Sequence, residues 1–180
     1  MSETLEKQLV DFWLRTDKTK EEVHQSCEQL GKVLSGPQEG KNRVASELLE
    51  IARDRKVRMS IRIFALGNLA SHSYLLNICG SDKAAKTLIE IFHSNYPPDR
   101  LMSEGLLADS ALEDPCSARG QEAVFIQEIL NTLYFVQYVE ARKLISERIE
   151  PFAGKRMATR LERLLERHRE LIRRKGVSER

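Results

Sequence analysis

Apolar residues recur at intervals of three and four along most of the chain, which is the spacing of helices that bury one face. Between residues 44 and 52, for example, apolar side chains stand at positions 44, 45, 48, 49, 51 and 52. The alternating pattern of a half-buried strand is nowhere sustained. The sequence therefore predicts an all-α protein, with helices over residues 3–15, 19–34, 42–54, 57–76, 82–94, 99–113, 120–136, 138–150 and 155–175.

Glycine, proline and capping residues separate these predicted helices. Thr19 and Ser81 stand where N-caps are expected, and the loop GPQEGK, residues 36–41, reads as a linker without phosphate-loop spacing. The breaks group the helices into four hairpins, about 1–34, 41–76, 81–113 and 119–152, followed by a closing helix over 154–176. A chain of 180 residues with 41% apolar and 31% charged residues fits a single domain, 1–180.

The segment DRKVRMSIRIFALGNLA, residues 54–70, has a more specific pattern: an acidic residue, a Val-Arg pair opening a helix, and a small-residue ending. It resembles the second half of a HEAT repeat through Asp54, Val57, Arg58, Ile61, Ala65, Leu66, Gly67, Leu69 and Ala70, although Ile61 replaces the small residue that the family prefers. The resemblance implies stacked hairpins, with Asp54 and Arg58 in a structural ladder between repeats.

Weaker similarities to this segment recur about 40 residues apart, which is the spacing of HEAT and armadillo units. Asp99-Arg100 lies 42 residues after Val57-Arg58, and Val139-Glu140 lies a further 40 along the chain. The expected fold is an α-α superhelix of about four HEAT-like hairpins plus a C-terminal capping helix. A non-repeat helical bundle is the alternative.

Signatures of catalysis are missing from the sequence. No phosphate-loop, dinucleotide, zinc-protease or nucleophile-elbow motif occurs, and the four histidines and three cysteines are isolated. We expect no catalytic residue, metal site or cofactor, and therefore no enzymatic activity. The single tryptophan, Trp13, shares a helix face with Leu9 and Phe12, which favours packing in the core.

Basic residues are unevenly distributed although the net charge is only +2. The predicted closing helix aligns five arginines in a stripe beside an apolar face, and a second basic cluster surrounds the turn near residue 55. If these residues bind an anionic partner or nucleic acid, the contacts come from Arg156, Arg160, Arg163, Arg167, Arg174, Arg55, Lys56 and Arg62. A stripe of glutamates, Glu162, Glu166 and Glu170, flanks the arginines and partly neutralises them.

An acidic stretch opposes this basic character. Residues 99–122 hold six carboxylates against Arg100 and Arg119. A surface of that kind repels nucleic acid and favours a protein partner with charges of both signs.

The function expected from the sequence is a non-enzymatic protein-interaction scaffold or adaptor. Nucleic-acid binding through the basic closing helix is the first alternative, and a HEAT-like DNA repair glycosylase with a pocket holding an aromatic and a carboxylate is the second. No run approaches the roughly 18 apolar residues that a membrane span requires, and the first residues lack the features of a signal peptide. We therefore expect a cytoplasmic protein that binds another protein, with its oligomeric state left open.

Overall fold

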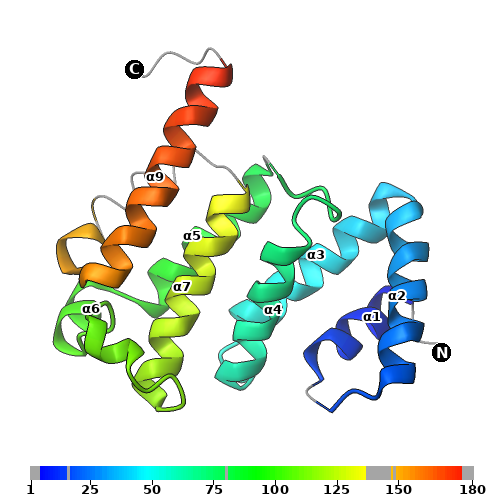
Figure 1. Ribbon diagram of the computed structural model, residues 1–180, viewed down its shortest axis with the longest axis horizontal. Coiled ribbons are helices and arrows are strands. Elements are labelled where there is room, and N and C mark those ends of the chain that lie inside the picture. Colours follow the sequence, from blue (N-terminus) through cyan, green and yellow to red (C-terminus); the bar gives the residue numbers. More distant parts are fainter. Residues whose placement is uncertain (1–4, 16, 80, 137–146, 148, 176–180) are drawn as a thin grey trace. The chain divides into compact units, whose positions relative to one another are not determined.

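The computed structural model describes residues 5–15, 17–79, 81–136, 147 and 149–175, and its described secondary structure is entirely helical (Figure 1). This confirms the all-α class. The chain divides into two compact units, residues 1–79 (unit 1) and residues 80–180 (unit 2). None of the helices described is long and apolar enough to cross a membrane.

The described part of unit 1 forms the helices α1 (Leu5–Leu14), α2 (Lys20–Ser35), α3 (Gln38–Arg53) and α4 (Met59–Ser71). Helix α1 packs against the other three, and α3 packs along α4. Trp13 is only 8% exposed and its ring stacks on His72 with centroids 4.5 Å apart, so the prediction that it belongs to the core is confirmed. The other buried apolar side chains described in unit 1 are aliphatic. Most come from α1, α3 and α4, including Leu9, Val44, Leu48 and Leu66, and Val33, Leu76 and Ile78 are buried as well.

Local hydrogen bonds explain where two of these helices begin. The side chain of Thr19 accepts from the Glu22 amide while the Glu22 carboxylate accepts from the Thr19 amide, a capping box that starts α2. Helix α3 starts at Gln38, directly after Pro37, so the prediction that residues 36–41 form a linker is wrong beyond Pro37. Proline supplies the extended backbone that precedes a helix, and the pattern of polar residues in this first turn concealed the helix start.

The chain beyond α4 keeps turning. The amide of Leu76 donates to the carbonyl of His72, and the amides of Asn77 and Ile78 donate to the carbonyls of Tyr74 and Ser73. With Asn77 in the left-handed region at φ 55°, these last two bonds form a Schellman motif. The predicted helix over 57–76 thus ends as an α-helix at Ser71, and hydrogen-bonded turns continue to the motif.

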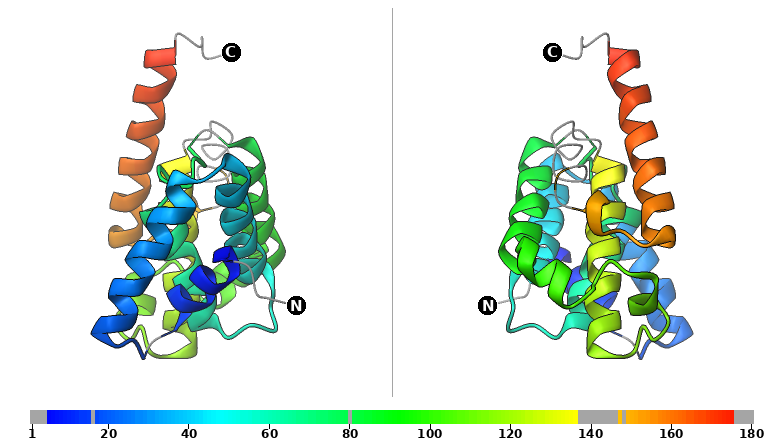
Figure 2. Two further views of the ribbon diagram at one scale, coloured as in Figure 1. Left: turned by 90° about the vertical axis from the view of Figure 1, so that its right-hand side faces the viewer. Right: turned by 90° about the vertical axis from the view of Figure 1, so that its left-hand side faces the viewer.

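Unit 2 is arranged around α7 (Ala118–Val136), which contacts α5 (Asp82–Asn95), α9 (Lys155–Lys175) and the short 3₁₀ helix η1 (Asp109–Leu112). Between α5 and η1 lies α6 (Pro98–Ser103), and a second 3₁₀ turn, η2 (Glu150–Phe152), precedes α9. The end of α9 extends beyond α7 and α5 (Figures 1 and 2).

The prediction of one helix in unit 2 is wrong, and that of another falls mainly on residues that the structure does not describe. The chain over 99–113 forms α6, a turn with Gly105 at φ 55°, and η1 instead of one continuous helix. A left-handed glycine in the middle of the segment breaks the helical hydrogen bonding. The predicted helix over 138–150 falls mainly on residues outside those described, whereas the helix over 155–175 is confirmed.

Candidate binding surfaces

The turn between α3 and α4, residues 53–58 (the basic turn), is tightly hydrogen-bonded. The Asp54 amide donates to the carbonyl of Glu50 over 2.9 Å, and the Val57 amide donates to the carbonyl of Asp54 over 3.2 Å. Oδ1 of Asp54 also accepts from the Lys56 amide over 2.9 Å. The one carboxylate of the turn therefore accepts a hydrogen bond from the backbone, which helps to fix the conformation of the turn.

The basic side chains of this turn point into solvent. Arg53, Arg55, Lys56 and Arg58 are all exposed, and Arg53 lies 3.9 Å from a carboxylate oxygen of Glu50. Among the described residues, no salt bridge joins Lys56 or Arg58 to a carboxylate. The turn thus presents at least two cations whose charge is not neutralised by an adjacent partner.

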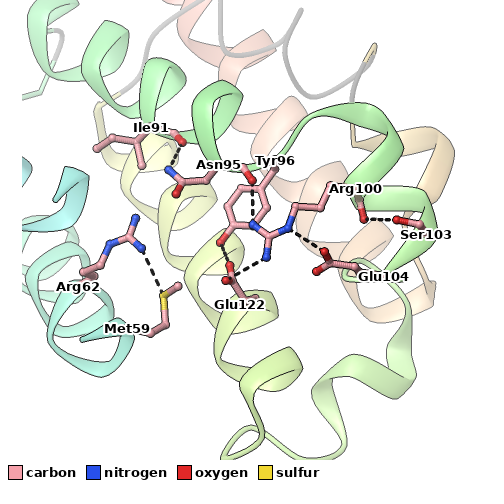
Figure 3. A network of polar contacts seen from close by, with 9 residues as sticks. All are labelled: Met59, Arg62, Ile91, Asn95, Tyr96, Arg100, Ser103, Glu104 and Glu122. Carbon is pink, nitrogen blue, oxygen red and sulfur yellow. Dashed lines mark hydrogen bonds and ion pairs between the residues drawn. The ribbon is translucent and has the colours of Figure 1, made fainter. Parts of the chain in front are cut away.

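Arg62 does not belong to this surface, contrary to its grouping with the basic turn in the sequence. It is 3% exposed, and its Nε donates to the backbone carbonyl of Ala52 over 2.8 Å. Its Nη1 reaches Sδ of Met59 at 4.0 Å, as the close-up in Figure 3 shows. Arg58 is the N-cap residue before α4, with an extended ψ of 141°, whereas Arg62 lies within the helix and packs against α3, where it binds a carbonyl near the helix end. It is unavailable to a bound anion.

Among the side chains described in unit 1, three large apolar ones are exposed, and we group them as the apolar surface: Phe64 at 45%, Tyr74 at 85% and Leu75 at 43%. Phe64 belongs to α4, and the other two lie in the turns that continue from it. Tyr74 and Leu75 are adjacent in the chain, and the hydrogen-bonded turns that carry them follow directly from the last residue of α4. The sequence analysis did not select these residues, although the run from Ile61 to Phe64 places apolar side chains on more than one side of the helix.

Helix α9 is fixed at its start by η1. Oδ1 of Asp109 accepts from the Arg156 amide over 2.9 Å, and the Gly154 amide donates to the carbonyl of Leu107 over 2.8 Å. Met157, Leu161 and Leu165 are buried, as the apolar face of the sequence predicted.

The arginine stripe of α9 is described only in part. Arg156 and Arg163 are exposed. Arg163 lines a shallow recess of about 350 Å³ with Glu150, Glu162, Leu165, Glu166 and Arg169, in which Arg169 pairs with Glu166 at 2.9 Å. The side chains of Arg160, Arg167 and Arg174 lie outside the description, so their part in the stripe stays a prediction.

Several of the acidic residues over 99–122 bind other groups of unit 2. Glu104 and Glu122 both pair with Arg100, at 2.9 and 3.2 Å, and Asp109 caps α9. Oδ1 of Asp114 accepts from the Cys116 amide over 3.2 Å. Asp99, Glu104, Glu113 and Asp114 are nevertheless exposed, so the acidic character expected from the sequence is still present at the surface.

Figure 3 shows that Arg100 and Tyr96 meet at Glu122. The Tyr96 hydroxyl donates to Oε2 of Glu122, and Nη2 of Arg100 donates to Oε1. Nη1 of Arg100 donates to the carbonyl of Asn95 over 2.9 Å, and its guanidinium lies 5.4 Å from the centre of the Tyr96 ring. The hydrogen bond to Glu104, followed by that to Glu122, raises the pKa of Arg100 against the opposing effect of burial. The cluster joins the end of α5, the start of α6 and α7, and its groups satisfy one another.

A groove of about 310 Å³ between α1 and α2 is lined by Phe12 and by polar residues: Gln8, Asp11, Arg15, Glu22, Gln25 and Gln29. It contains an aromatic and carboxylates, which are the residue types that the repair-enzyme hypothesis requires. However, Glu22 is held by the capping box and by Arg15 at 3.0 Å. Hydrogen bonds from Thr19 and then Arg15 lower the pKa of Glu22, which keeps the carboxylate charged. This is the arrangement of a structural ion pair.

The described residues contain no group of three or more His, Cys, Asp or Glu side chains placed to hold a metal ion. Cys79 and Cys116 are free and exposed. Comparisons of the chain with protein-family models, with curated proteins and with solved structures found no match. The candidate surfaces are therefore argued from the geometry and charge of the described residues.

Proposed function

We propose that the chain is a non-enzymatic, cytoplasmic scaffold of HEAT-like helical hairpins that binds another protein through the apolar surface of unit 1. The observation that carries this proposal is the exposure of Tyr74, at 85%, next in the chain to the half-exposed Leu75, together with the half-exposed Phe64 of α4. Aromatic side chains dominate the binding energy of protein interfaces because they bury a large area at a small entropic cost.

The fold proposal rests on the segment that resembles a HEAT repeat. Its residues 54–70 form the turn after α3 and most of α4, and the two helices pack along each other as a hairpin. Ala65, Leu66, Leu69 and Ala70 of that segment are buried. The remaining residues of α4 include the exposed Phe64, so the helix offers apolar area beyond that used inside unit 1. In repeat proteins, apolar area of this kind is what one hairpin buries against the next.

Site-directed photocrosslinking tests the proposal. A benzophenone amino acid is placed at Tyr74 in the full chain, with the same amino acid at Met102, 58% exposed in unit 2, as the matched control. After irradiation in the native cell extract, we expect one protein to be crosslinked from position 74 and absent from position 102.

The crosslinked protein is then purified and titrated against wild type and Tyr74→Ser. A loss of affinity of tenfold or more in the variant supports the proposal. Equal crosslinking from both positions, or a partner whose affinity is the same for the variant, contradicts it. Self-association is checked by sedimentation, since a second copy crosslinked from position 74 also overturns the scaffold role.

A further inference from the structure

We propose that the basic turn is a binding site for the phosphate backbone of duplex nucleic acid. The turn contributes four exposed cations, Arg53, Arg55, Lys56 and Arg58, within six residues. This proposal concerns a different surface from the one proposed to bind protein and does not depend on it.

The charge of the turn is poorly balanced from within. Its six residues hold four cations and one carboxylate, Asp54, and among the residues described no salt bridge joins Lys56 or Arg58 to a carboxylate. Binding a polyanion neutralises such cations and releases the counterions condensed on the phosphates, which is the main source of affinity in nucleic-acid binding.

The turn is also held in place before any ligand arrives. Arg62 anchors the end of α3 through the Ala52 carbonyl, and the amides of Lys56 and Val57 are bonded to Asp54. A cationic turn with a fixed backbone loses little conformational entropy on binding. Arg62 is thus a positioning residue for the turn and makes no phosphate contact.

Phosphate is a better match than an acidic protein segment. The only large apolar residue within the turn is Val57, which is half-buried, so the turn lacks the apolar anchors on which protein interfaces depend. A phosphate backbone requires only positive charge and hydrogen-bond donors. Contacts to the phosphate backbone do not read the bases, so we expect binding that is strongly salt-dependent and independent of base sequence.

A titration of fluorescently labelled duplex DNA tests the proposal. Duplexes of two unrelated base sequences are titrated with wild type, with the double variant Lys56→Glu and Arg58→Glu, and with the control Lys83→Glu and Lys86→Glu over a range of salt concentrations. The control residues are exposed on α5, and the two variants change the net charge equally. Circular dichroism spectra and melting curves confirm that each variant is folded.

We expect wild type and control to bind both duplexes similarly. The turn variant is expected to bind at least tenfold more weakly, with a slope of log K against log salt smaller by roughly 1.8, about 0.9 for each lost phosphate contact. Three results overturn the proposal: no binding by wild type at low salt, equal losses in the turn variant and the control, or tighter binding of polyglutamate than of DNA at the same salt. The protein-binding proposal is unaffected by any of these results.

Discussion

The two units join their helices in different ways. In unit 1, α3 and α4 are connected by a turn of a few residues whose hydrogen bonds are local, with Asp54 supplying both a carbonyl and a carboxylate acceptor. In unit 2, the connection from α5 to α7 contains α6 and η1 and is held by long-range contacts. The hydroxyl of Tyr96 reaches Glu122, and Asp109 reaches the amide of Arg156.

The difference shows where each unit is sensitive to change. A local turn leaves its side chains free for solvent or a ligand, which is how Lys56 and Arg58 come to be exposed. A connection held by side chains uses its charged groups internally, and Arg100, Glu104 and Glu122 therefore contribute little to a binding surface. We accordingly place both proposed surfaces in unit 1.

The largest difference between the units is expected at their glycines. A Cβ on Gly120 would lie 1.9 Å from the carbonyl oxygen of Asp114 and 2.8 Å from Cα of Pro115, whereas at Gly67 it would meet nothing within 4 Å. Gly120→Ala should cost about 3 kcal/mol of unfolding free energy because backbone atoms must move. Gly67→Ala, inside α4, should be stabilising by roughly 0.5–1 kcal/mol. Urea unfolding followed by circular dichroism measures both, and similar effects of the two changes would refute the contrast.

Arg62→Met should have the next largest effect. The change removes a buried charged donor from the Ala52 carbonyl, and we expect a loss of about 2 kcal/mol. Arg58→Met, on the exposed side of the turn, should change stability by less than about 0.5 kcal/mol. Fluorescence of Trp13, the single tryptophan, follows unfolding in unit 1. If Arg58→Met proved the more destabilising change, the assignment of Arg62 to structure and Arg58 to the surface would be reversed.

Tyr96→Phe tests the side-chain linkage of unit 2. The hydroxyl of the fully buried Tyr96 donates to a carboxylate, so its removal should cost about 1.5 kcal/mol. A double-mutant cycle with Glu122→Gln should give a coupling energy near 1 kcal/mol. Additive effects of the two substitutions would mean that the linkage contributes nothing to stability.

The smallest expected effect is a pH dependence from Glu22 in unit 1. Hydrogen bonds from Thr19 and Arg15 hold its pKa below the ordinary value of 4.5. Its stabilising contribution is therefore present in full above that ordinary value, and it is lost as the pH falls through the lower pKa of the folded state. Glu22→Gln should be less stable than wild type at pH 7, with the gap closing at pH 3. Glu21→Gln serves as the control, and a gap that persists at pH 3 would exclude this origin.

Helical periodicity predicted the class of the fold and most of its helices because burial of one face depends on local sequence. The helices over 19–34, 82–94 and 155–175 agree with α2, α5 and α9 to within a residue or two. Periodicity failed over 99–113. There the chain bends at Gly105, where φ is 55° and Arg119 donates to the carbonyl over 2.9 Å, a contact set by distant packing.

The candidate surfaces were predictable to a smaller extent. Charge alone identified Arg55 and Lys56, which are exposed in the turn. It also selected Arg62, because charge does not distinguish an exposed cation from one that is buried against a neighbouring helix. Tyr74 and Leu75 were missed, since an apolar residue is expected to be buried unless the structure shows otherwise. Charge also identified the acidic stretch, but the pairing of Arg100 with Glu122, 22 residues away, could not be deduced from spacing.

Hydrogen exchange on the purified complex is the most direct test of the claim that unit 1 carries the protein-binding surface. The full chain, alone and saturated with the partner crosslinked from position 74, is compared by mass spectrometry after matched labelling times. The account predicts added protection in peptides covering residues 64–79 and no change across α5 and α7. Protection confined to unit 2, with residues 64–79 exchanging as in the free protein, would contradict it.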